Sequence, residues 1–207
     1  MSKNNLMGRE YWLDISNYHH AWANRARFAA RKIPHLWVCD IGCGRQDLSQ
    51  YLSPSAVYLP SDIKAWDDGV ELCDLNEKIL PKRYLAIADV AVLLGVVERI
   101  YDLPSLFCEL SRSVEYLVVS YHPIERRPDN PCLTVWHHQY STLEFTSVLA
   151  DAGFGDIKTR LFQEQTIWYA RSNLFSDEQR SVRAASRLTY AGARPNWRLR
   201  LKRAFGL

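Results

Sequence analysis

The segment Val38–Gly44, with the sequence VCDIGCG, restricts the possible folds of this chain more than any other stretch. The residues before Asp40 are apolar without polar alternation, which is typical of a central parallel strand covered by helices on both faces. Gly42 and Gly44 follow at once, and without β-carbons they let the backbone approach a ligand closely. A strand, a glycine turn and a helix start in this order predict a nucleotide-cofactor crevice at the carboxyl end of a parallel sheet.

Strand and helix signals alternate along most of the chain. Apolar segments predict strands at residues 35–40, 56–60, 70–73, 90–94 and 116–120. Helices are expected over residues 8–31, from Asp47, from Asp102 and over residues 141–152. An antiparallel hairpin is expected over residues 156–162 and 166–171, followed by helices from Ser176 and from about Pro195. This order favours an α/β sheet with helices on both faces.

Capping residues mark the starts of three of these helices. Asp102 is suited to cap the helix that follows it. Ser141 with Glu144, and Ser176 with Gln179, have the spacing of a capping box, in which the first side chain and the residue three positions later satisfy each other's backbone N–H groups.

The length of the chain suits one domain with additions at both ends. With 207 residues and 47% hydrophobic content, it can bury one substantial core, and two independent domains are not expected. We expect an N-terminal helical cap over residues 1–34, a core over residues 35–172 and a basic helical extension over residues 173–207.

The cysteines and the apolar runs indicate a reduced, cytoplasmic protein. The five cysteines form no CxxC pair, and several lie in predicted strands or helices, where cysteine serves as a small apolar residue. Residues 1–10 are polar, and the longest apolar run, residues 90–97, is too short to cross a bilayer. Neither export nor a membrane span is therefore expected.

Charge is distributed unevenly along the chain. The formal net charge is +3, but eight arginines and lysines follow Glu178 without any acid, so the preceding residues carry a net charge of −5. A mildly acidic body argues against general nucleic-acid binding. From Trp197 onward, apolar residues at helical spacing separate from the cations. We prefer a basic helix docked on the acidic body to the alternative, an interfacial helix on an anionic surface.

Carboxylates and glycines follow four successive predicted strands, and in this order the chain resembles the class I S-adenosylmethionine-dependent methyltransferases over residues 36–172. The resemblance implies a Rossmann-like, doubly wound, mostly parallel sheet of seven strands with an antiparallel last strand. It also implies S-adenosylmethionine as the cofactor, bound along the carboxyl ends of the strands.

In that family an acidic residue and two glycines close the first strand, and Asp40, Gly42 and Gly44 match them. Cys43, between the glycines, is expected to be a small residue near the cofactor without a nucleophilic role. Gln46 replaces the usual third glycine, and it adopts a positive φ less readily than glycine does. We therefore expect a wider turn or a slightly different position of the cofactor. The GxGxxG pattern of dinucleotide enzymes is not completed here.

The resemblance assigns further cofactor contacts to the later strand ends. Asp62, with Ile63 beside it, would hold the ribose hydroxyls. Asp74 and Leu75, after the third strand, would reach the adenine. The methionine portion would pass the end of the fourth strand, at Leu94 and Gly95.

His122 is the candidate catalytic residue. It follows the fifth predicted strand, and an imidazole suits the removal of a proton from an acceptor hydroxyl or amine. A structural histidine in a turn is the alternative. Four further histidines lie on the first predicted helix or on the loop over residues 121–140, namely His19, His20, His137 and His138. Adjacent histidines without other ligands do not predict a metal site.

The first predicted helix carries aromatic residues and arginines. We expect the aromatic set to lie mostly in the core, with one ring facing the sulfonium as a minority alternative; its members are Tyr11, Trp12, Tyr18 and Trp22. Arg25 and Arg27 are suited to hold the cofactor's carboxylate or an acidic substrate, although we expect both on the solvated surface.

These features favour a methyltransferase that acts on an oxygen or nitrogen of a small molecule, sugar or glycan. The loop over residues 121–140 is the expected substrate loop. A nucleic-acid acceptor is not expected, because residues 94–97 are LGVV, where amino-methylating nucleic-acid enzymes usually carry an Asn/Asp-Pro-Pro-aromatic element. A non-catalytic binding or scaffold protein with the same fold is the competing hypothesis. The acceptor and the oligomeric state stay open.

Overall fold

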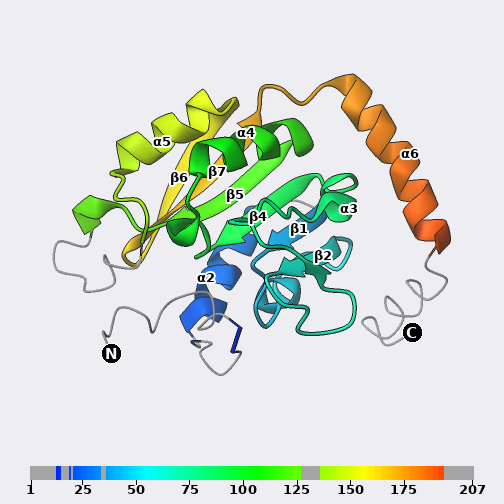
Figure 1. Ribbon diagram of the computed structural model, residues 1–207, viewed down its shortest axis with the longest axis horizontal. Helices are drawn as coiled ribbons and strands as arrows, with labels where there is room; N and C mark the ends of the chain where they lie inside the picture. The colour runs from blue at the N-terminus through cyan, green and yellow to red at the C-terminus, as the bar shows by residue number, and fades with distance from the viewer. Residues whose placement is uncertain (1–12, 15–18, 20, 34–35, 127–135, 194–207) are drawn as a thin grey trace.

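A seven-stranded sheet forms the centre of the computed structural model, which describes residues 13–14, 19, 21–33, 36–126 and 136–193 (Figure 1). The strands are β1 Trp37–Ile41, β2 Val57–Asp62, β3 Glu71–Leu72, β4 Val90–Leu94, β5 Tyr116–Tyr121, β6 Phe154–Phe162 and β7 Gln165–Ser172. Their order in the sheet is β3-β2-β1-β4-β5-β7-β6. The first five strands pair in parallel, whereas β7 is antiparallel to both neighbours. The predicted Rossmann-like sheet with an antiparallel end is confirmed.

The described residues also form five α-helices and three short 3₁₀ helices. The α-helices are α2 Ala21–Ala30, α3 Lys82–Leu85, α4 Leu103–Ser113, α5 Thr142–Asp151 and α6 Asp177–Ala193. The 3₁₀ helices are η3 Asp47–Gln50, η4 Val97–Arg99 and η5 Ile124–Arg126. The predicted caps are confirmed at all three positions: Asp102 accepts the N–H of Ser105, and reciprocal bonds join Ser141 with Glu144 and Ser176 with Gln179.

The core lies on both faces of the sheet, because alternate residues of each strand point to opposite sides. On one face Ala91 of β4 belongs to a buried cluster with Phe107 of α4 and Phe145 of α5. On the other face Val92, the next residue of β4, packs in a cluster with Ala29 of α2. β4 is therefore covered by helices on both sides, as its continuous apolar sequence predicts.

The sequence-based prediction differs from the structure mainly in the short elements. The third strand covers two residues, Glu71–Leu72, where residues 70–73 were expected. α3, η4 and η5 were not predicted, since three or four residues are too few to show a helical period. The continuous helix expected over residues 8–31 is wrong: α2 begins at Ala21, and Leu13, Asp14 and His19, which are also described, are not helical. The helix expected from about Pro195 lies outside the described residues. No helix in the described ranges is both long and apolar enough to span a membrane.

α6 lies along one side of the molecule and crosses the amino ends of β4 and β5 (Figure 1). Arg187 donates to Oδ1 of Asp89, the residue before β4, at 2.5 Å. Arg180 is paired with Glu115, the residue before β5, at 3.0 Å. Arg183 lies between them, with Nη1 3.9 Å from Asp89 Oδ1. The arginines of this helix therefore dock on acidic residues of the body.

Replacing Asp89 by alanine should lower the free energy of unfolding by about 3 kcal/mol. The side chain of Arg183 is 6% exposed, and burial lowers its pKa to about 10 although the charge of Asp89 opposes this shift. Without Asp89 the guanidinium would stay desolvated and would lose the carboxylate beside it. Denaturant unfolding followed by circular dichroism tests this, with Asp151→Ala at the exposed end of α5 as the control. Equal stabilities of the two variants would contradict the expectation.

Candidate cofactor and acceptor site

The glycine turn after β1 brings the ends of three strands together. The N–H groups of Gly42 and Cys43 donate to the carbonyl oxygen of Ser61 in β2, at 2.8 and 3.1 Å. Gly42 has a φ of 78°, and a β-carbon at this position would overlap Cγ2 of Val96, which follows β4. Glycine is therefore required here both by the backbone conformation and by the close approach of Val96.

Gln46 occupies the left-handed region itself, with φ 60° and ψ 30°. Its N–H donates to the carbonyl oxygen of Cys43 at 2.7 Å, which closes the turn. The backbone thus adopts the conformation that a glycine would favour at this position, at a cost of about 1 kcal/mol for a residue with a β-carbon. Gln46 therefore adopts a positive φ despite its β-carbon, and a different position of the cofactor stays a prediction.

Asp62 joins the end of β2 to the glycine turn. Its Oδ2 accepts the N–H of Gly44 at 2.8 Å, and its Oδ1 accepts the N–H of Ile63 at 2.7 Å. The residue is 8% exposed, and burial raises its pKa against the opposing effect of these backbone hydrogen bonds. A carboxylate held in this way has further lone pairs to offer to hydroxyl groups of a ligand.

Asp40 lies in β1, directly before the glycine turn. Its Oδ2 accepts the hydroxyl of Tyr58 at 2.7 Å, and the residue is 4% exposed. Burial raises its pKa to about 7, and the nearby charge of Asp62 adds to the shift. Burial also raises the pKa of the Cys43 thiol, which agrees with the expectation that Cys43 is no nucleophile. Both residues therefore support the turn from within the fold.

Asp74 and Leu75 lie on the same edge of the sheet, beside β2. The N–H of Cys73 donates to the carbonyl oxygen of Asp62 at 2.8 Å, which holds the end of β3 against β2. Asp74 exchanges backbone hydrogen bonds with Ile79 and is 6% exposed. The ends of β3, β2 and β1 are thus neighbours along this edge of the sheet.

The end of β4 is covered by Arg25 of α2. Nη2 of Arg25 donates to the carbonyl oxygen of Leu94 at 2.9 Å, and a β-carbon on Gly95 would lie 2.5 Å from Nη1. Gly95 has a φ of 72° and donates its N–H to Oγ of Ser120 at 2.8 Å. Arg25 is 7% exposed, so the expected solvated position is wrong for this residue; Arg27 is exposed as expected.

Burial lowers the pKa of Arg25 to about 10, while the charge of Glu98 opposes the shift. The Nε of Arg25 is buried and has no hydrogen-bond partner among the described residues. A guanidinium that is still charged at neutral pH therefore lies at the end of β4 with hydrogen-bonding capacity in reserve.

His122 and Glu98 form a buried pair at the ends of β5 and β4. Nδ1 of His122 lies 3.0 Å from Oε1 of Glu98, whose side chain is 2% exposed. Burial alone would raise the pKa of Glu98, but the hydrogen bond with His122 and the charge of Arg99 outweigh it, so the pKa is lowered. The ring of His122 stacks on Trp136, with centroids 5.0 Å apart. An ionised carboxylate thus fixes the orientation of this imidazole.

The other histidines are placed differently from His122. His137 stacks on Tyr101 with centroids 4.1 Å apart, and Nε2 of His138 is 2.8 Å from the carbonyl oxygen of Ile100. His19 is exposed before α2. His20, Tyr11, Trp12 and Tyr18 lie outside the described residues. The part of the chain that the structure describes contains no cluster of three potential metal ligands.

Sequence reasoning found the strand-end residues but missed two interactions. Glu98 was not a predicted site residue, and its pairing with His122 spans 24 residues. Arg25 was expected in solvent, and its contact with Leu94 spans 69 residues. Buried apolar residues surround Arg25 at helical spacing in α2. This pattern is the signal from which an inward side chain could have been predicted.

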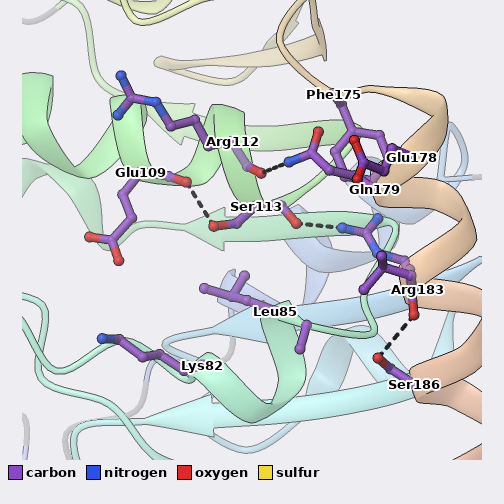
Figure 2. Close-up of a pocket in the computed structure, with 12 residues that line it drawn as sticks. Lys82, Leu85, Glu109, Arg112, Ser113, Phe175, Glu178, Gln179, Arg183 and Ser186 are labelled. Atoms are coloured by element: carbon purple, nitrogen blue, oxygen red, sulfur yellow. Dashed lines mark hydrogen bonds between the residues drawn. The ribbon is translucent and has the colours of Figure 1, made fainter.

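A cavity of about 460 Å³ lies away from this site, between α3, α4 and α6 (Figure 2). Leu85 and Phe175 contribute apolar surface to it, and Lys82, Arg112 and Arg183 contribute cations. It is on the side of the sheet where the strands begin, whereas the glycine turn lies where they end. None of the predicted site residues lines it.

Comparison with known proteins gives matches among solved structures. The chain is similar to human N-acetylserotonin methyltransferase in complex with SAM (TM-score 0.58, 14% identity), covering 79% of this chain and 56% of that one. It is similar to the N-terminal domain of EvdMO1 in the presence of SAH and D-fucose (TM-score 0.54, 14% identity, 84% and 100% covered). A possible histamine N-methyltransferase from Thermotoga maritima also matches (TM-score 0.52, 13% identity, 78% and 93% covered).

The chain has the fold of the class I S-adenosylmethionine-dependent methyltransferases. The mostly parallel seven-stranded sheet and its antiparallel end agree with this fold. No family model and no curated protein sequence matches the chain. The chain spans 56% of the length of the human methyltransferase.

Proposed function

We propose that the protein is an enzyme, an S-adenosylmethionine-dependent methyltransferase that methylates an oxygen or nitrogen of a small-molecule, sugar or glycan acceptor. The observation that carries this proposal is the link between Asp62 and Gly44, in which the carboxylate that ends β2 is fixed against the glycine turn after β1. Two of the structural neighbours named above are described with SAM or SAH, which supports the same cofactor here.

The residues along the strand ends fit the parts of this cofactor. Asp62, beside Ile63, would accept the ribose hydroxyls, because its carboxylate is fixed by two backbone donors and has lone pairs left. Asp74 and Leu75 would border the adenine. The methionine portion would lie along Gly42, Cys43, Gly44, Leu94 and Gly95. Arg25 would pair with its carboxylate, since a charged group at that buried position would complete the hydrogen bonding of the guanidinium.

The same arrangement suits proton removal from the acceptor. The bound cofactor supplies an electrophilic methyl group on a sulfonium centre. His122 would take the proton of the acceptor at Nε2 while Glu98 holds Nδ1, and the negative charge of Glu98 would stabilise the imidazolium that forms. Alignment of the acceptor with the methyl group would supply the rest of the acceleration.

The class of acceptor is supported by the neighbours and by the surroundings of His122. The neighbours are described as an N-acetylserotonin methyltransferase, a domain in the presence of D-fucose and a possible histamine N-methyltransferase, and all three compounds are small molecules. Trp136, Tyr101 and His137 stand beside the His122–Glu98 pair and would contact such a molecule. We place the protein in the cytoplasm, and the free thiols of Cys39, Cys43, Cys73 and Cys108 agree with a reducing compartment.

Ligand-induced stabilisation of the full chain tests the proposal most directly. S-adenosylmethionine or S-adenosylhomocysteine at 100 times its dissociation constant should stabilise the protein by about 2.7 kcal/mol. A panel of small hydroxyl, amine and sugar acceptors would then be screened for methyl transfer. Stabilisation without transfer to any acceptor would favour the scaffold hypothesis, and no stabilisation by either ligand would refute the cofactor assignment.

Replacing Glu98 by glutamine removes the charge of this side chain and keeps its size and shape. The amide can still accept a hydrogen bond from Nδ1 of His122, but it no longer stabilises an imidazolium. We expect kcat to fall about tenfold and the affinity for S-adenosylhomocysteine to stay within about twofold. Steady-state kinetics and titration calorimetry measure the two effects. A loss of cofactor affinity as large as the loss of kcat would assign Glu98 a structural role.

A further inference from the structure

The loop that follows β2 carries Trp66 four residues after Asp62. The loop begins with Ile63, whose N–H donates to Oδ1 of Asp62 at 2.7 Å. Nζ of Lys64 donates to the carbonyl oxygen of Leu13 at 3.1 Å, and it lies 4.7 Å from the ring centroid of Trp66. Trp66 is partly buried, whereas Lys64 is exposed, so the side chain of Lys64 can move aside when a ligand approaches the indole.

The indole N–H of Trp66 is a buried donor that lacks an acceptor. Its Nε1 is buried and has no hydrogen-bond partner among the described residues. A buried N–H left without an acceptor costs about 1 to 3 kcal/mol, so such groups are normally paired. An indole has no other polar atom and can only donate. The surroundings of Trp66 are therefore suited to a ligand group that accepts a hydrogen bond.

The carboxylate of Asp62 indicates which group this is. Burial raises the pKa of Asp62, while the N–H groups of Gly44, Trp66 and Ile63 oppose the shift, so the indole N–H lies beside the carboxylate. The carboxylate oxygens accept the backbone N–H groups of Gly44 and Ile63, and lone pairs are left for a further donor. An ionised carboxylate only accepts, whereas an indole only donates. A hydroxyl can donate to the carboxylate and accept from the indole at the same time.

We infer that Trp66 and Asp62 together bind one ribose hydroxyl of the cofactor, and that Trp66 thereby selects ribose over deoxyribose. This inference rests on the proposed function, because it takes S-adenosylmethionine as the ligand. The hydroxyl donates to Asp62 and accepts the N–H of Trp66, so both side chains are satisfied by one group. A phosphate would be repelled by Asp62, and an ammonium group would leave the indole N–H without an acceptor.

Replacing Trp66 by phenylalanine removes the N–H and keeps an aromatic ring. The full chain is titrated by calorimetry with S-adenosylhomocysteine and with its 2′-deoxy and 3′-deoxy analogues. The wild type should bind one of the two analogues at least about tenfold more weakly than the parent compound. Trp66→Phe should bind the parent compound about fivefold more weakly than the wild type does. Its affinity for that one analogue should equal that of the wild type, since the analogue lacks the hydroxyl on which Trp66 acts.

Trp37→Phe is the matched control, because it removes an indole N–H at the start of β1, at the other end of the strand from the glycine turn. It should bind all three ligands like the wild type. Equal weakening of all three ligands by Trp66→Phe would overturn the inference, and so would wild-type affinity for the parent compound. The ligands are compared within each variant, so a small loss of stability does not affect the result. If the wild type itself failed to bind S-adenosylhomocysteine, the proposed cofactor would be refuted together with the inference.

Discussion

Replacing Asp62 by alanine should raise the dissociation constant for S-adenosylmethionine about a hundredfold. The carboxylate has two expected tasks: it accepts the N–H groups of Gly44 and Ile63, and it would accept the ribose hydroxyls. A charge-assisted hydrogen bond contributes about 1.5 to 3 kcal/mol, so losing the ribose contacts and loosening the turn together account for an effect of this size. Titration calorimetry with S-adenosylhomocysteine measures it without a need for the acceptor.

Two variants separate ligand contacts from the integrity of the turn. Asp68→Ala, on the exposed part of the loop after β2, removes an acid without touching Gly44 and should bind like the wild type. Asp62→Asn keeps one acceptor oxygen and should fall between the wild type and Asp62→Ala. Wild-type affinity in Asp62→Ala would rule out the proposed ribose contact.

His122→Ala should lower kcat about a thousandfold and leave the affinity for the cofactor within about twofold. The imidazole is held by Glu98 at the end of β5, and none of the proposed cofactor contacts involves it. Single-turnover measurements with a saturating cofactor distinguish loss of chemistry from loss of binding. Imidazole added to the buffer should restore part of the activity of the variant.

His137→Ala is the matched control, because this histidine follows Trp136 on the same loop and stacks on Tyr101 without contacting Glu98 through its ring. It should change KM more than kcat. If His122→Ala kept wild-type turnover with an acceptor, another base or simple alignment of the acceptor would be responsible for the rate.

The strand ends were predictable because each is set by local sequence. A continuous apolar run such as Val90–Leu94 can be satisfied only in the interior of the sheet, and the carboxylate or glycine after it then lies on the carboxyl edge. The helix starts were equally local, since Asp102 and Ser141 bond to backbone groups within three residues. For this reason Asp62, Asp74 and Gly95 could be predicted at the ends of strands.

The missed features all depend on contacts between distant residues. Arg25 becomes buried only because β4 ends beneath α2, and Glu98 is ionised in the interior only because His122 returns from β5. The inward direction of the α6 arginines depends in the same way on Asp89 and Glu115. A charged residue gives no local signal of burial, because its partner lies far away in the sequence and is brought close only by the fold.

α6 docks where β4 and β5 begin, whereas the proposed site lies where these strands end. β4 has five residues, which corresponds to about 16 Å from its start to its end. A change at the docked edge, such as Asp89→Ala, should therefore lower the stability of the protein and leave the proposed cofactor contacts in place. Stability and cofactor affinity can thus be altered separately in this fold.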